Sequence, residues 1–277
     1  MPLQISVGQA THIGAREENE DYAGCVTPEA AVAQVKGALL AVADGVGGGA
    51  AGREASEFTV RGVLSDYYAT PDTWEVPFAF EKILAAINRW LLAQGSARRE
   101  MAGMATTLSA LVLRGARYYT VHVGDSRVYR LRGESMQQLT TDHVWDRPDM
   151  RHVLKRAVGL DQFLSVDYAD GELAAGDVFV LATDGVWEPL GDKAMHELLL
   201  LHREPQREQE KQQGRQREQQ HHEGPQSAAQ NCPPEDPRHA ALTLVELAQD
   251  LLRERLDRAA ATEVRRARAF VPQRRLD

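Results

Sequence analysis

Short apolar runs that end in glycine or aspartate recur along the first two thirds of the chain. Aliphatic and β-branched residues bounded by such turn residues are typical of β-strands. The runs that fit this pattern cover residues 37–45, 106–115, 117–126 and 177–185. We therefore expect four strands there, two of them joined by a tight turn at Arg114-Gly115-Ala116-Arg117.

Between the first two of these strands the apolar spacing changes to that of helices. Residues 52–69 and 77–94 predict two helices. The second has one apolar face, formed by Phe80, Ile83, Leu84, Ile87 and Trp90. A turn signal at Leu131-Arg132-Gly133-Glu134 predicts another antiparallel hairpin. Strands grouped in hairpins, with helices in pairs, favour an α+β fold in which helices cover the outside of the sheets.

The pattern breaks down after about residue 202. Residues 203–238 are rich in glutamine and contain no Val, Ile, Leu, Met or aromatic residue, so they predict a low-complexity, disordered insertion. Helical periodicity returns within residues 240–256, at Leu244, Leu247, Ala248 and Leu251. We expect one domain over residues 1–257 that contains this insertion, followed by an Ala- and Arg-rich tail at residues 258–277.

Composition and charge narrow the classes of protein that remain. The 277 residues carry a net charge of −8, which argues against general nucleic-acid binding. No apolar run approaches the ~20 residues that a membrane span requires, and the N-terminus lacks a signal-peptide pattern, which favours the cytoplasm. Cys25 and Cys232 provide neither a disulfide framework nor a zinc site. Nothing in the pattern indicates oligomerisation, so a monomer is expected.

Acidic residues stand beside the turns at the ends of the apolar runs. The four segments concerned are Glu18-Asn19-Glu20-Asp21, Ala43-Asp44-Gly45, Val123-Gly124-Asp125 and Thr183-Asp184-Gly185. Carboxylates that converge from several strand ends repel one another unless a cation neutralises them. Mg²⁺ or Mn²⁺ fits best because hard ions prefer oxygen ligands. A single Asp-Gly pair is ordinary turn chemistry, so it is the combination of four that predicts a metal site.

Two features near these acids bear on phosphate chemistry. Two ions that share a carboxylate can hold a bridging hydroxide and clamp a phosphoryl oxygen. Arg16 lies four residues before Glu20 and has the guanidinium geometry for a phosphate oxygen pair, with an ordinary surface arginine as the alternative. The glycine-rich residues 45–52 could instead cradle a nucleotide phosphate, but they lack the Gly-Lys-Ser/Thr ending of a P-loop.

Together these residues resemble a known family. The order and spacing of six motifs over about residues 5–190 are similar to those of the metal-dependent protein serine/threonine phosphatases of type 2C, in their bacterial form. The motifs are Gly14-Ala15-Arg16-Glu17-Glu18-Asn19-Glu20-Asp21, Ala43-Asp44-Gly45-Val46-Gly47-Gly48, Gly103-Met104-Ala105-Thr106-Thr107, Val123-Gly124-Asp125-Ser126-Arg127, Leu139-Thr140-Thr141-Asp142-His143 and Leu181-Ala182-Thr183-Asp184-Gly185.

The resemblance implies a four-layer αββα sandwich, with two antiparallel sheets face to face and helix pairs outside. It implies hydrolysis of phosphoserine and phosphothreonine by a water bound between two Mn²⁺ or Mg²⁺ ions, with a third, weaker ion. Arg16 would hold the substrate phosphate and Asp44 would bridge the two metals. The implied metal shell consists of Glu20, Asp21, Asp44, the Gly45 carbonyl, Asp125 and Asp184. The implied partner is a phosphorylated protein, the target of a cognate serine/threonine kinase.

The chain departs from the family in three places. Val46 stands where eukaryotic relatives often have a histidine proposed as general acid. The stretch between Asp142 and Gly176, where the family has a flap, is short, and is either a trimmed loop or an altered substrate rim. His143, Trp145, Asp146 and His152 lie in this stretch.

The third departure concerns the end of the domain. The family has an Asp-Asn pair before its last core strand, and that Asp is a metal ligand, but no Asp-Asn dipeptide occurs in this chain. After residues 240–256 comes Arg258-Ala259-Ala260-Ala261-Thr262-Glu263-Val264-Arg265-Arg266. A reading-frame shift or truncation, or a basic tail that docks a partner, would explain this sequence. The alternative function is therefore a catalytically impaired module that binds a phosphoprotein without turnover.

Overall fold

The computed structural model describes residues 3–14, 16–147, 149–150 and 153–200. The chain divides into two compact units, Met1–Trp187 and Glu188–Asp277, and the strands named below belong to the first. The predicted insertion at 203–238, the predicted helix at 240–256 and the tail at 258–277 lie outside the described residues, as does Cys232. Within the described part, no helix is long and apolar enough to cross a membrane.

The larger sheet is antiparallel throughout and holds most of the predicted strands. Its order is β1-β2-β4-β5-β8, and β3 pairs with the end of β2. The strands are β1 (Asp21–Val26), β2 (Ala38–Val46), β3 (Ala105–Thr106), β4 (Leu108–Arg114), β5 (Arg117–Val123) and β8 (Asp167–Glu172). The predicted strand at 37–45 and the predicted hairpin across residues 106–126 are confirmed.

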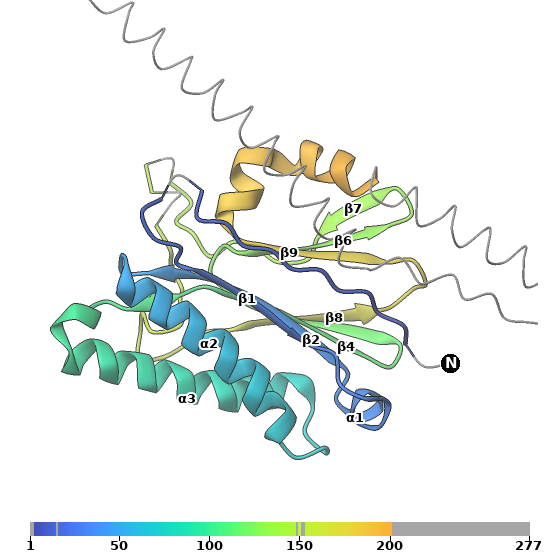
Figure 1. Cartoon of the computed structure of the whole chain (residues 1–277), viewed down its shortest axis with the longest axis horizontal. Coiled ribbons are helices and arrows are strands. Elements are labelled where there is room, and N and C mark those ends of the chain that lie inside the picture. The colour runs from blue at the N-terminus through green and yellow to red at the C-terminus, as the bar shows by residue number, and fades with distance from the viewer. Residues whose placement is uncertain (1–2, 15, 148, 151–152, 201–277) are drawn as a thin grey trace, which may run out of the picture. The chain divides into compact units, whose positions relative to one another are not determined.

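A second antiparallel sheet has the order β7-β6-β9. Its strands are β6 (Arg127–Arg132), β7 (Ser135–Gln138) and β9 (Val178–Ala182), and the hairpin predicted at 131–134 joins β6 to β7. Apolar side chains fill the space between the sheets: Leu111, Leu113 and Tyr118 of the larger sheet pack against Phe179 and Leu181 of β9. Because each sheet buries one apolar face against the other, the first unit is a two-sheet sandwich (Figure 1).

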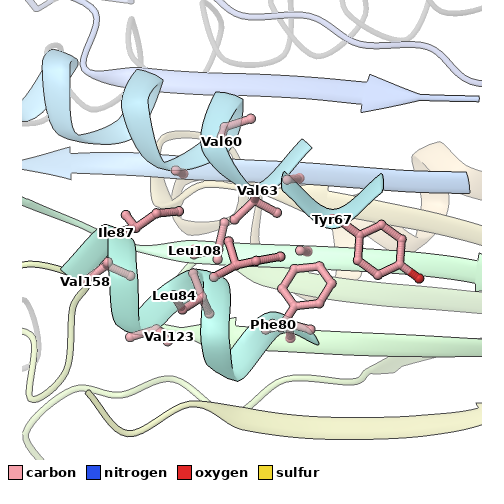
Figure 2. Close-up of a cluster of buried hydrophobic side chains, with 14 of the residues drawn as sticks. Val60, Val63, Tyr67, Phe80, Leu84, Ile87, Leu108, Val123 and Val158 are labelled. Atoms are coloured by element: carbon pink, nitrogen blue, oxygen red, sulfur yellow. The ribbon is translucent and has the colours of Figure 1, made fainter. Parts of the chain in front are cut away.

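Two helices cover the other face of the larger sheet. They are α2 (Ala50–Ala69) and α3 (Val76–Ala97), close to the helices predicted at 52–69 and 77–94, and η1 (Arg99–Met101) follows α3. Figure 2 shows their apolar faces meeting the sheet, with Val60 and Tyr67 from α2 beside Phe80 and Leu84 from α3. This core anchors the sheet ends at which the acidic residues lie.

The remaining described elements are short or belong to the second unit. Helix α1 (Ala30–Val35) connects β1 to β2. Residues 184–187 begin a helical segment directly after β9, and residues 188–200 of the second unit are also helical, with Leu190, Met195 and Leu198 buried. Two antiparallel sheets with helices outside make the fold α+β, as predicted.

Candidate active site

The pairing of β1 with β2 brings the first two predicted acids together. Asp21 lies directly opposite Asp44 in the register of these strands. The backbone of Asp44 is held on its other side by two threonines. Its N–H donates to Thr107 Oγ1 over 2.9 Å, and its carbonyl accepts from Thr107 N and Thr106 Oγ1, each at 2.9 Å. The Asp44 main chain is therefore fixed from both neighbouring strands.

Asp125 lies in the turn that connects the two sheets. Gly124 before it has φ +107°, and a Cβ there would lie 2.6 Å from the Thr107 side chain, so only glycine fits. Ser126 after it is fully buried and shares a 2.7 Å hydrogen bond with Thr107 Oγ1. The same threonine thus contacts the turn of Asp125 and the backbone of Asp44.

Asp184 follows β9, at the start of the helical segment. The preceding Thr183 donates its hydroxyl to Asp21 Oδ2 over 2.9 Å. Three residues further on, the indole Nε1 of Trp187 donates to the carbonyl oxygen of Asp125 over 3.1 Å. These two contacts tie the end of β9 to Asp21 and to Asp125.

The four aspartates form one electrostatic cluster. Burial, reinforced by the charges of Asp21, Asp184 and Asp125, raises the pKa of Asp44 to about 9. Burial, with the charge of Asp184 as the next cause, raises the pKa of Asp125 to about 6. The pKa of Asp21 is also raised, mainly by burial and then by Asp184, although the Thr183 hydrogen bond and Arg16 oppose the shift. A site that holds its own carboxylates near the protonated state favours a cation strongly.

Glu20 and Gly45 border this cluster. Glu20 Oε1 is buried without a hydrogen-bond partner, and a Cβ at Gly52 on α2 would lie 2.8 Å from it. The Glu20 carbonyl accepts from Gly45 N at 3.1 Å and from Ser56 Oγ at 2.5 Å, so its backbone is fixed while its buried Oε1 lacks a donor. Arg16 is exposed, and its charge acts on Asp21, so it reaches the cluster electrostatically from the solvent side.

The donor set fits a divalent cation, although the side chains do not enclose one as they stand. Among the described residues, no three His, Cys, Asp or Glu side chains form a ready metal cage. The donors are nonetheless all oxygens, which hard ions prefer. The unpartnered Glu20 oxygen and the raised pKa of Asp44 both mark groups that a cation would stabilise. Glu20, Asp21, Asp44, Asp125 and Asp184 are therefore the side chains that could hold a hard divalent cation.

Several buried polar residues next to this cluster do not follow from sequence patterns. Beneath the Asp125 turn, Ser109 Oγ contacts the Ser126 carbonyl at 2.5 Å and His122 Nδ1 at 2.9 Å, and His122 Nε2 contacts the Thr141 carbonyl at 3.0 Å. Burial lowers the pKa of His122 to about 4, with His143 adding to the effect. In the sequence, the one sign of these buried polar residues is that they interrupt the apolar runs of the strands.

The residues at which the chain departs from the family have different surroundings. His143 is 6% exposed, so it lies beneath the surface. Trp145 is exposed, and Lys155 Nζ lies 5.4 Å from the centroid of its ring. Val46 is exposed at the end of β2. His152 lies outside the part of the chain that the structure describes.

Comparisons of the sequence with known proteins bear on the family of the chain. The sequence profile of protein phosphatase 2C matches residues 8–223. A serine/threonine phosphatase (stp) of Listeria innocua is 30% identical over 203 residues, which cover 66% of this chain and 78% of that protein. Protein phosphatase PhpP of Streptococcus pneumoniae is 26% identical over 215 residues, covering 70% of this chain and 84% of that protein.

The solved structures agree as well. The crystal structure of the Mycobacterium tuberculosis serine/threonine phosphatase PstP/Ppp superposes with a TM-score of 0.61 and 25% identity. The match covers 86% of this chain and 87% of the other. A bacterial serine phosphatase superposes with a TM-score of 0.64 at 22% identity, covering 87% of this chain and 90% of the other, which bears on the fold alone.

Proposed function

Because the chain belongs to the protein phosphatase 2C family and is therefore a protein phosphatase, we propose that it hydrolyses phosphoserine and phosphothreonine in proteins at the aspartate cluster. The observation that carries this proposal is the convergence of Asp21, Asp44, Asp125 and Asp184 from four separate segments. The substrate class follows from its relatives, which are named serine/threonine phosphatases.

The acidic residues of the chain would bind the metal ions, and Arg16 would bind the substrate phosphate. Asp44 is acted on by the charges of Asp21, Asp184 and Asp125 and is the acid whose pKa is raised most, so a bound cation would stabilise its carboxylate most; the family resemblance would make it the ligand shared by two ions. Glu20, Asp21, Asp125 and Asp184, together with the Gly45 carbonyl, would complete the ligand set. Arg16 is exposed beside Asp21 and would bind two oxygens of the incoming phosphate.

Divalent cations bound there would supply Lewis-acid stabilisation of phosphoryl charge and lower the pKa of a bound water. Phosphoryl transfer depends almost entirely on positioning and electrostatic stabilisation. The rigid backbone of Asp44 and the fixed turn at Asp125 serve positioning. No covalent intermediate is required, and Cys25, which is half-buried and has its pKa raised by burial, is unsuited to act as a nucleophile.

A catalytically impaired module that binds a phosphoprotein is the second candidate. One observation favours it: the chain contains no Asp-Asn dipeptide, the pair whose Asp is a metal ligand in the family. The retained Asp44, Asp125, Asp184 and Arg16 favour the active enzyme.

The deciding experiment measures phosphate release from matched peptides that carry phosphoserine, phosphothreonine or phosphotyrosine, with Mn²⁺ titrated from zero. We expect Mn²⁺-dependent release from the first two peptides. Asp44→Asn keeps the side-chain volume while removing the shared carboxylate, and should lower kcat by 100-fold or more, or about 2.7 kcal/mol. Saturable binding of the phosphopeptide without release at any Mn²⁺ concentration would instead establish the impaired module.

A further inference from the structure

The turn that carries Asp125 is held by a side chain from a distant segment. Gly124 lies one residue beyond the last pair of the β4–β5 register, Leu108 with Val123. Its N–H donates to His143 Nδ1 over 3.1 Å, and its carbonyl accepts from the His143 N–H over 2.7 Å. One residue, His143, thus satisfies both main-chain groups of Gly124.

These contacts define the tautomer of His143. A backbone N–H can only donate, so Nδ1 accepts from Gly124 and the proton of the neutral ring resides on Nε2. Nε2 lies 3.0 Å from Asp167 Oδ2 on β8, to which it donates. Arg156 Nη1, 3.3 Å from Nε2, donates to the other carboxylate oxygen of Asp167 over 2.9 Å. The carboxylate therefore orients the ring whose other nitrogen holds Gly124.

The Gly124 peptide has little freedom to find another partner. Its φ of +107° and the Thr107 side chain behind it leave no room for a shift toward β4. The His143 side chain is 6% exposed, so water competes weakly for Nδ1. The adjacent peptide carries Asp125, whose carbonyl oxygen is fixed by Trp187. Nδ1 therefore holds the chain before Asp125 and Trp187 holds it after, so a change at Nδ1 would release only the side that enters Asp125 and so change the direction of its side chain.

We propose that His143 is a positioning residue of this enzyme: oriented by Asp167, its Nδ1 fixes the Val123–Gly124 peptide through the Gly124 N–H and so aims the Asp125 carboxylate into the aspartate cluster. The proposal rests on the proposed function, because the direction of the Asp125 carboxylate matters for the ion that this carboxylate would help to bind. Partners of this kind usually change metal affinity 10–100-fold when they are removed.

Two substitutions separate the two ring nitrogens. In His143→Asn, the amide oxygen has the same number of bonds from the backbone as Nδ1 and can accept from Gly124. In His143→Gln, the longer amide reaches the place of Nε2 and can donate to Asp167, but it offers nothing to Gly124. If Nδ1 positions Asp125, the Asn variant should behave like the wild type and the Gln variant should not.

The first measurement is calorimetric Mn²⁺ binding without substrate. We expect the weakest binding step to lose at least 10-fold in affinity in His143→Gln and less than threefold in His143→Asn. In phosphopeptide hydrolysis, kcat should fall with the affinity in the Gln variant while KM stays within twofold. Equal losses in both variants, or lowered thermal stability with unchanged Mn²⁺ affinity, would show a purely structural histidine and overturn the proposal.

The second measurement needs neither metal nor activity. Hydrogen exchange at the Gly124 amide in chelator should be at least 10-fold faster in His143→Gln than in the wild type, and close to the wild type in His143→Asn. If the wild type neither binds Mn²⁺ nor releases phosphate, the proposed function fails, and with it the role of His143 toward an ion. If the wild type is active but Gly124 exchanges equally in all three proteins, only the positioning role of His143 fails.

Discussion

At the scale of single residues, Asp44 shows how backbone hydrogen bonds force an unfavourable charge arrangement. Thr106 and Thr107 hold its N–H and carbonyl, and the strand register places it opposite Asp21. The Asp44 main chain therefore stays where burial, and then the charges of Asp21 and Asp184, raise the pKa of its carboxyl. The same constraint prepares the site for cations, since repulsion among carboxylates is relieved by positive charge.

We predict that the chain without metal becomes less stable as pH rises. The pKa of Asp44 is about 9 in the folded state and 3.8 as its ordinary value, so between these limits the native state holds the extra proton. The free energy of unfolding then falls with rising pH, by up to about 1.4 kcal/mol per unit for one proton. The shifts at Asp21 and Asp125 have the same sign. Urea unfolding in chelator at pH 6 and pH 8 measures the effect.

Asp44→Asn tests the origin of that pH dependence. The substitution removes the need for this carboxylate to take up a proton on folding, so at pH 8 in chelator it should raise the free energy of unfolding by about 1–3 kcal/mol and flatten its pH profile. Asp66→Asn, an exposed site on α2, is the matched control and should change stability by less than about 0.5 kcal/mol. A loss of stability in Asp44→Asn at pH 8 would contradict the assigned repulsion.

At the scale of elements, strands and helices with a regular apolar period could be predicted and strands of polar sequence could not. Strands β2, β4, β5 and β9 consist largely of apolar residues because most of their side chains are buried or half-buried. Strand β8 has the sequence Asp-Tyr-Ala-Asp-Gly-Glu, exposed along nearly its whole length. It is a strand because it pairs with β5, with Arg117 and Asp170 forming an ion pair across the register. Such pairing is a tertiary contact that no local pattern encodes.

The residues of the candidate site also fall into those that the sequence predicts and those that it does not. Its acids were predictable because each stands beside a turn at a strand end. Ser109, His122 and His143 were not, because their role depends on contacts between residues far apart in the chain. The roles of Asp44, Asp125 and Asp184 as ligands remain predictions that the metal-binding experiments address.

The junction between α1 and α2 provides a prediction about a single element. Lys36 is 4% exposed, and its Nζ donates to the Thr70 carbonyl at 2.7 Å, to Thr70 Oγ1 at 2.9 Å and to the Pro71 carbonyl at 3.0 Å. These acceptors lie at the C-terminal end of α2, where a positive charge is also favoured by the helix dipole. Lys36→Met would leave them without this donor and should cost about 2–3 kcal/mol in urea unfolding.

The control is Lys82→Met on α3, where the ammonium is exposed and paired with Glu81, so a change below about 0.5 kcal/mol is expected. Both variants should retain phosphate release at 20 °C, because neither lysine contacts the aspartate cluster. Equal stability of the two variants would show that the Lys36 contacts do not stabilise the C-terminal end of α2.

At the scale of the whole molecule, stability and activity should depend on the same ions. The chain carries a net charge of −8, and its least favourable charges are gathered at one site. An ion that binds only the native state stabilises it by about 2.7 kcal/mol at 100 times its dissociation constant. At about 2–4 °C per kcal/mol for a body of this size, saturating Mn²⁺ should raise the melting midpoint by roughly 5–10 °C.

This shift should be specific to the aspartate cluster, which Asp44→Asn makes testable. In chelator the variant should melt above the wild type at pH 8, since it has no Asp44 carboxylate that must take up a proton on folding. In saturating Mn²⁺ the order should reverse, because the variant has lost the ligand that two ions would share. NaCl at matched ionic strength controls for general screening of the acidic surface. An Mn²⁺ shift of equal size in both proteins would mean that the ion binds elsewhere, and the cluster would then lose its assigned role. The order of the two melting midpoints can reverse only if the Asp44 carboxylate destabilises the fold without metal and binds the ion when metal is present.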